Sequence, residues 1–103
     1  MSSIKIRTKR LDGKTQIRIL IAHPMENGRN KDKISGELIP AHFIKELTVK
    51  HNDNFIITSN MAGSISKDPY FAFMLNGGQT GDKIVVHWED NLGKTDTEES
   101  TIQ

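Results

Sequence analysis

Apolar and polar residues alternate in short runs along most of this chain, with the period of two that is typical of β-strands with one solvent-facing side. The clearest run covers residues 16–22, where Ile17, Ile19 and Ile21 share one face. Turn residues recur at short intervals, which favours strands over helices as the units being joined. The pattern predicts strands at residues 4–7, 16–22, 41–50, 55–58, 70–75, 83–89 and 94–97.

These strands predict an all-β fold, an immunoglobulin-like β-sandwich of about seven antiparallel strands, as a single domain over residues 1–103. The run at 41–50 is ambiguous, because Phe43 and Leu47 also fit a helical spacing. A long connection between His23 and Pro40 exceeds the usual length of a structureless loop, so we expect it to form a small ribbon. The glycine-rich segment 77–81 is predicted to be a hairpin turn.

Three of the predicted strands carry apolar side chains on both faces, which a solitary two-layer sandwich does not require. Six of these residues are expected to fill the core between the sheets: Phe71, Phe73, Leu75, Ile84, Val86 and Trp88. Four others then point outward: Ile56, Tyr70, Met74 and Val85. A contiguous apolar patch on a small domain marks a protein interface more often than anything else, so these four are predicted to contact a partner. Curling of the sheet, or cover by a loop, is the alternative.

The composition of the chain argues against several classes of function. Among 103 residues, 14 lysines and arginines balance 13 acids, so the net charge of +1 predicts no binding to nucleic acid or to an anionic membrane. No run is long enough to span a membrane, and residues 1–10 lack the apolar core of a secretory signal. The absence of cysteine excludes disulfides, thiolate metal sites and a cysteine nucleophile.

The segment His23 to Gly28 ends the strand at 16–22, because a proline removes a ladder donor and Asn27-Gly28 favours a turn. Imidazole and thioether groups suit Cu(I), so His23, Met25 and Met61 are a candidate copper site. Ordinary packing of the methionines is favoured over this copper interpretation. The four histidines show no spacing typical of a zinc site.

No arrangement of residues indicates catalysis. Ser64 and Ser66 lack the flanking glycines of a nucleophile elbow, and Glu89 and Asp90 are expected to be solvated or to cap a turn. We therefore expect no enzyme activity, no catalytic residue, no metal and no cofactor. The basic residues Arg29, Lys31 and Lys33 are expected to form a solvated loop face.

Five segments, in this order, resemble the SoxZ family over nearly the whole chain. They are HPMENG (23–28), RNKD (29–32), IP (39–40), SISKDPYFAF (64–73) and WEDNLG (88–93). The chain departs from the family at Asp68-Pro69, where the family tends to have Asn-Pro, a change that keeps the turn chemistry.

The resemblance implies an immunoglobulin-like, non-catalytic subunit of the SoxYZ carrier complex of bacterial thiosulfate oxidation. In that family the partner is SoxY, whose flexible C-terminal arm bears the cysteine that carries the sulfur intermediates. The complex docks transiently to a c-type cytochrome, a sulfate-releasing hydrolase and a sulfur dehydrogenase. The resemblance also implies a periplasmic location reached by export together with SoxY. We expect Arg29, Lys31 and Lys33 to attract the anionic intermediate. Two alternatives come from other function classes: a periplasmic copper-binding β-sandwich protein that uses His23, Met25 and Met61, and an adhesion or structural module.

Overall fold

The computed structural model describes residues 2–26, 28–60 and 67–103. This part of the chain forms seven strands, and the all-β prediction is confirmed. The strands are β1 (Ile4–Leu11), β2 (Lys14–Ile21), β3 (Ile44–His51), β4 (Asn54–Asn60), β5 (Tyr70–Asn76), β6 (Lys83–Asp90) and β7 (Thr95–Thr101). The ambiguous run is therefore a strand from Ile44 onward. The described residues hold no helix long and apolar enough to cross a membrane.

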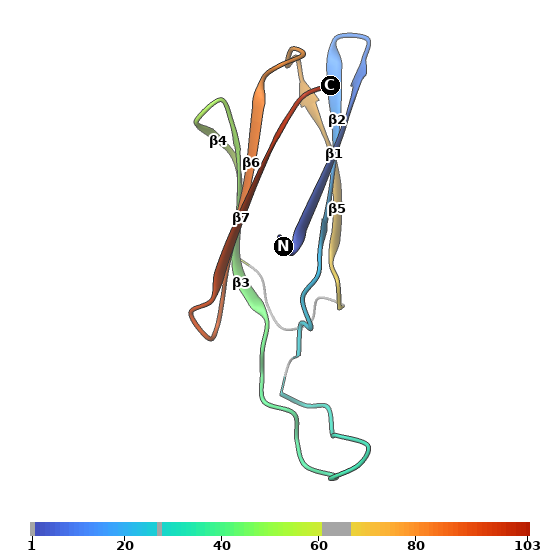
Figure 1. Cartoon of the computed structure of the whole chain (residues 1–103), viewed down its shortest axis with the longest axis vertical. Coiled ribbons are helices and arrows are strands. Elements are labelled where there is room, and N and C mark those ends of the chain that lie inside the picture. Colours follow the sequence, from blue (N-terminus) through green and yellow to red (C-terminus); the bar gives the residue numbers. More distant parts are fainter. Residues whose placement is uncertain (1, 27, 61–66) are drawn as a thin grey trace.

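The strands form two antiparallel sheets that face each other (Figure 1). One sheet has the order β1-β2-β5 and the other has the order β4-β3-β6-β7. These are the neighbours A-B-E and C′-C-F-G of an immunoglobulin-like sandwich. The predicted sandwich of seven antiparallel strands is thus confirmed.

The core lies between the sheets, where the alternating apolar residues of β2 meet those of β3 and β6. Ile17, Ile19 and Ile21 are fully buried, as are Ile84 and Val86. Trp88 is buried beside them, so the prediction for β6 is correct. Three residues of β5 predicted to be core are only partly buried: Phe71, Phe73 and Leu75. They face inward, but β5 is a free edge of its sheet and leaves them uncovered on one side.

Turn chemistry explains two of the connections. Asn52 and Asp53 both have positive φ, as a two-residue hairpin of type I′ between β3 and β4 requires. The segment 77–81 is not a hairpin turn, because β5 and β6 belong to different sheets and this segment crosses between them. Gly78 has φ +80°, and a Cβ atom there would lie 2.7 Å from Thr15 Oγ1. Close packing of the crossover on β2 therefore requires a glycine.

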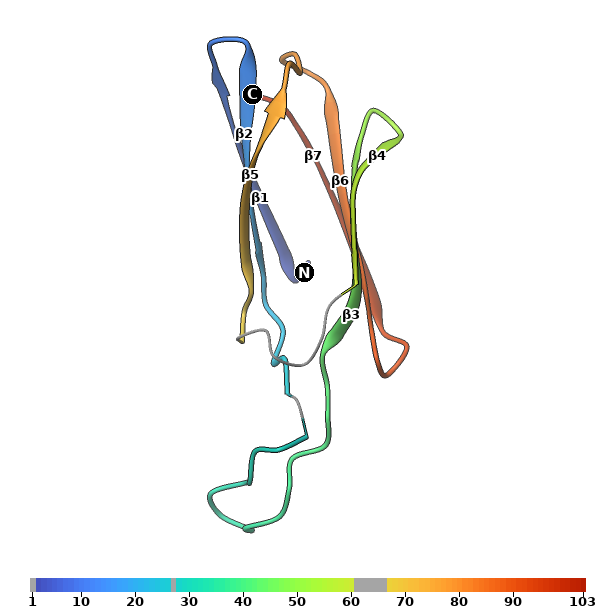
Figure 2. The same cartoon turned by 180° about the vertical axis from the view of Figure 1, so that it is seen from behind.

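The two sides of the sandwich differ. On one side β1 lies beside β7, and hydrogen bonds join the residue before β1 to the opposite sheet. Ser3 donates from its amide and its hydroxyl to Asp96 Oδ2, at 2.8 and 2.6 Å, and Trp88 Nε1 donates to Ser3 Oγ at 3.1 Å. On the other side the edge strands β4 and β5 face each other without pairing. The sandwich is closed along β1 and β7 and open along β4 and β5 (Figure 2).

Glu26 and residues 28–42 extend from one end of the sandwich as a long loop, here called the finger (Figure 1). Single antiparallel bridges join Glu26 to His42 and Lys31 to Leu38. At the tip, the Asp32 carboxylate accepts hydrogen bonds from the amides of Ile34 and Ser35. The expected ribbon is present in this irregular form. Part of its predicted Asn27-Gly28 turn lies outside the described residues.

Candidate functional site

An apolar groove runs along the open side of the sandwich, between the edge strands β4 and β5. Ile19, Leu47 and Val49 are buried core residues at its base. Its volume is about 380 Å³. Its walls are Ile57 and Ser59 of β4 and Tyr70, Phe71, Ala72 and Phe73 of β5. Within the described part of the chain both strands are edges of their sheets, each paired with a neighbouring strand on one side only, and such an edge can receive a strand or a loop from another chain.

The four predicted interface residues do not form one patch. Tyr70 and Met74 point outward from the three-stranded sheet and are 57% and 46% exposed. Val85 lies on the outer face of the opposite sheet, beside the exposed ring of Phe55. Ile56 is partly buried and packs against the core. The expected contiguous patch is therefore wrong, because Tyr70 and Met74 lie on the outer face of one sheet and Val85 lies on the outer face of the other, on opposite sides of the sandwich. Of the four, only Tyr70 borders the groove.

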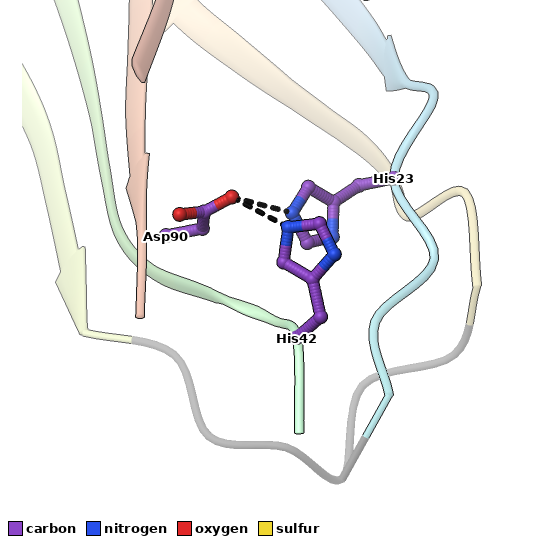
Figure 3. A group of neighbouring side chains, drawn as sticks. All are labelled: His23, His42 and Asp90. Atoms are coloured by element: carbon purple, nitrogen blue, oxygen red, sulfur yellow. Dashed lines mark hydrogen bonds and ion pairs between the residues drawn. The ribbon is translucent and has the colours of Figure 1, made fainter. Parts of the chain in front are cut away.

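A second cluster lies at the base of the finger, where His23, His42 and Asp90 meet (Figure 3). His23 follows β2, His42 precedes β3 and Asp90 ends β6. His42 Nε2 is 2.8 Å from Asp90 Oδ2, and His23 Nε2 is 3.3 Å from the same oxygen. Asp90 is fully buried, and its other oxygen, Oδ1, accepts the amides of Leu92 and Lys94. All four hydrogen bonds compensate for burial of this carboxylate.

The hydrogen bonds fix where the ring protons lie. Met25 N donates to His23 Nδ1 at 3.1 Å, so this nitrogen carries a lone pair and His23 is neutral. The proton of His23 is therefore on Nε2, directed at Asp90. His42 Nε2 also faces the carboxylate and must donate to it. Both rings thus act as donors to one oxygen.

The pKa values agree with these assignments. Burial lowers the pKa of His23, and nearby His42 lowers it too, against the raising effect of its hydrogen bond to Asp90. Burial alone would raise the pKa of Asp90. The hydrogen bonds from His42, the Lys94 amide, His23 and the Leu92 amide outweigh burial and hold that pKa below its ordinary value. At neutral pH Asp90 is therefore a buried carboxylate, and the neutral ring of His23 and two backbone amides are among its donors.

Two histidines and an aspartate within 4.8 Å of one another have the composition of a metal site. A metal on His23 Nε2 would need that nitrogen's lone pair, and it would place the ring proton on Nδ1, against the Met25 amide. The donors therefore do not fit a metal in this arrangement. The candidate copper ligands are engaged as well: Met25 is buried and its Sδ accepts the Ile44 amide at 3.4 Å. Met61 lies outside the described residues.

The cluster fixes the finger to the sandwich. His42 ends the finger, and its hydrogen bond to Asp90 ties that end to β6. Next to it, Asn91 donates from Nδ2 to the Ala41 carbonyl and accepts the Phe43 amide at its Oδ1. The rings of His23 and Trp88 meet edge to face, with centroids 5.2 Å apart. The role of this cluster is structural: it fixes the position at which the finger leaves the sandwich.

Arg29, Lys31 and Lys33 are exposed on the finger, as expected. The same segment contains Glu26, Asp32 and Glu37, so its charges balance. Attraction of an anion by the three cations remains a prediction.

Sequence reasoning did not predict the histidine–aspartate cluster. Asp90 caps the turn after β6, as expected, but it is buried rather than solvated. Local spacing gives no signal, since 67 residues separate His23 from Asp90. The topology does give one: in an immunoglobulin-like sandwich the B–C and F–G loops lie at the same end. Residues at the end of β2, before β3 and at the end of β6 must therefore meet.

Fold and surfaces define a small immunoglobulin-like module with one apolar edge open to a partner. The family model of the sulphur oxidation protein SoxZ matches residues 4–101, and the chain belongs to this family. It is thus a subunit of a Sox sulfur-oxidation system. Proteins of the SoxZ family associate with other Sox proteins. A search of curated proteins found no match.

Proposed function

We propose that this chain is the non-catalytic scaffold subunit of a SoxYZ carrier complex. It binds SoxY, and the cysteine on the C-terminal arm of SoxY carries the sulfur intermediates during thiosulfate oxidation. Family membership supports this proposal. The chain has no cysteine, so it cannot itself be the covalent carrier. Its role is to bind SoxY and to complete the surface that the Sox enzymes visit.

The open side of the sandwich carries the structural argument for a partner. Phe71 and Phe73 face the core but are only partly covered, and Tyr70 and Met74 continue the apolar surface around the same edge strand. Covering this edge removes apolar area from water and pairs the free edge of β5. SoxY is the proposed occupant. Val85 and Ile56 would belong to this interface only if SoxY reached the outer face or the edge of the second sheet.

The remaining parts of the proposal follow from the carrier role. This chain is exported to the periplasm together with SoxY, and the complex works there. There it docks transiently to the c-type cytochrome, the sulfate-releasing hydrolase and the sulfur dehydrogenase. Arg29, Lys31 and Lys33 attract the anionic intermediate over a range that salt shortens.

Heterodimer assembly with purified SoxY tests the proposal by calorimetry. Tyr70→Asp and Met74→Lys each place a charge on the edge, and each should weaken binding about thirtyfold, the effect of a residue worth about 2 kcal/mol. Leu92→Asp is the matched control, because Leu92 is 58% exposed in the turn between β6 and β7. Unchanged assembly in both variants would place SoxY elsewhere, and absence of any complex would refute the scaffold role.

A further inference from the structure

The nearly neutral net charge conceals a division of charge between the two sheets. The strands β1, β2 and β5 contain six lysines and arginines and no acidic residue. The strands of the other sheet contain six acidic residues and three lysines. Alternation directs five of the six cations to the outer face of the three-stranded sheet. This basic face consists of Lys5, Arg7, Lys9, Lys14 and Arg18, all exposed.

A hollow of about 310 Å³ lies on this basic face. Its lining consists of Lys5, Arg7, Arg18, Leu20 and Tyr70. Three cations and a phenol therefore surround one concave space, and each of these four groups can donate hydrogen bonds. Leu20 is opposite both Lys5 and Tyr70 in the strand register, which brings the two polar side chains to either side of it.

The arrangement brings like charges together on neighbouring strands. Arg7 lies directly opposite Arg18 across the β1–β2 ladder, with Cβ atoms about 5 Å apart. Like charges in this position destabilise a sheet. In the described part of the chain, the ion pairs involve neither arginine nor Lys5. Asp68 borders an adjoining hollow with Lys5, where its Oδ1 accepts the amide of His23.

We propose that this hollow binds a tetrahedral sulfur oxoanion of the sulfate or sulfonate type. Each guanidinium can offer two parallel N–H donors to two oxygens, and Lys5 and the Tyr70 hydroxyl can donate to the others. Three cations around one space exceed what a single flat carboxylate needs. They match a group with three or four oxygens. A bound anion also screens the repulsion between Arg7 and Arg18.

The oxoanion has two possible sources: an ion free in solution, or a group carried on the arm of SoxY. The second source rests on the proposed function, and the first does not. Leu20 and Tyr70 leave part of the hollow apolar, and Tyr70 also borders the groove proposed for SoxY. The two sites therefore adjoin.

Titration of the ¹⁵N-labelled chain with sodium sulfate and sodium thiosulfate, followed by NMR, tests the site. Sodium chloride at equal ionic strength serves as the reference. Saturable amide shifts are expected around Arg7, Arg18 and Tyr70. Arg18→Gln should weaken sulfate binding about tenfold, the effect of losing one charge-assisted hydrogen bond. Arg18→Lys keeps the charge but loses the bidentate contact, and should also weaken it.

The control is Lys45→Gln, which makes the same change of net charge on the opposite sheet and should leave binding unaltered. Shifts that do not saturate, that chloride reproduces, or that Lys45→Gln reduces as much as Arg18→Gln would overturn the site. A second measurement identifies the source. If the arm carries the anion, SoxY with an S-sulfonated cysteine should bind the chain more tightly than SoxY with a free thiol, and Arg18→Gln should abolish the difference. Equal binding of both forms of SoxY would assign the site to the free ion, and failure of SoxY to bind would leave the sulfate result standing.

Discussion

Replacing Asp90 by asparagine tests the role of the histidine–aspartate cluster most directly. The asparagine side chain would keep an oxygen for the Leu92 and Lys94 amides, but its NH₂ group would face two ring N–H groups. His42 can change its tautomer and accept a hydrogen bond from the amide. His23 cannot do so, because its Nδ1 must accept the Met25 amide. One buried pair of donors is thus left facing each other, and two hydrogen bonds to a charge are lost.

Hydrogen bonds to charged groups contribute about 1.5–3 kcal/mol each. With the recovery through His42, Asp90→Asn should lower the free energy of unfolding by about 3 kcal/mol. For a domain of this size that corresponds to a fall in Tm of roughly 10–20 °C. Urea unfolding and calorimetry measure both quantities. Asp12→Asn, in the exposed turn between β1 and β2, is the control and should change stability by less than about 0.5 kcal/mol. A loss below about 1 kcal/mol for Asp90→Asn would refute the reasoning.

Two further predictions concern pH and backbone geometry. The pKa of His23 is lowered from its ordinary value of 6.5, so the unfolded chain takes up a proton at this site before the folded chain does. The free energy of unfolding should therefore fall as pH drops below about 6.5, with a smaller slope in His23→Gln. The pKa of Asp90 is lowered from 3.8, so its contribution is present above that pH and is lost as pH falls through the folded value. Equal slopes from about pH 7 to 5 in both proteins would contradict this account. Gly78→Ala should cost about 1–2 kcal/mol more than Gly13→Ala in thermal melts: both positions have positive φ, but only at Gly78 does the added Cβ meet other atoms. Equal losses would show that packing against Thr15 is unimportant.

The strands and the fold class could be predicted from the order of residues alone. The alternation at β2 and β6 places Ile17, Ile19, Ile84 and Val86 in the core because a strand has only two faces, and one of them is buried. The turn at Asn52 and Asp53 was also predictable, since these residues tolerate positive φ. Local chemistry decides such features.

The surfaces that the strands create together depend instead on how the chain folds in three dimensions. The alternation predicts that Tyr70 and Val85 both point outward, but their strands belong to different sheets. The assignment of a strand to a sheet depends on pairing between distant segments. The same holds for His23 and Asp90, and for the basic face, which exists because three strands without acids are neighbours. A count of charges along the chain cannot reveal that division, since electrostatic interaction depends on distance in space rather than on separation in sequence.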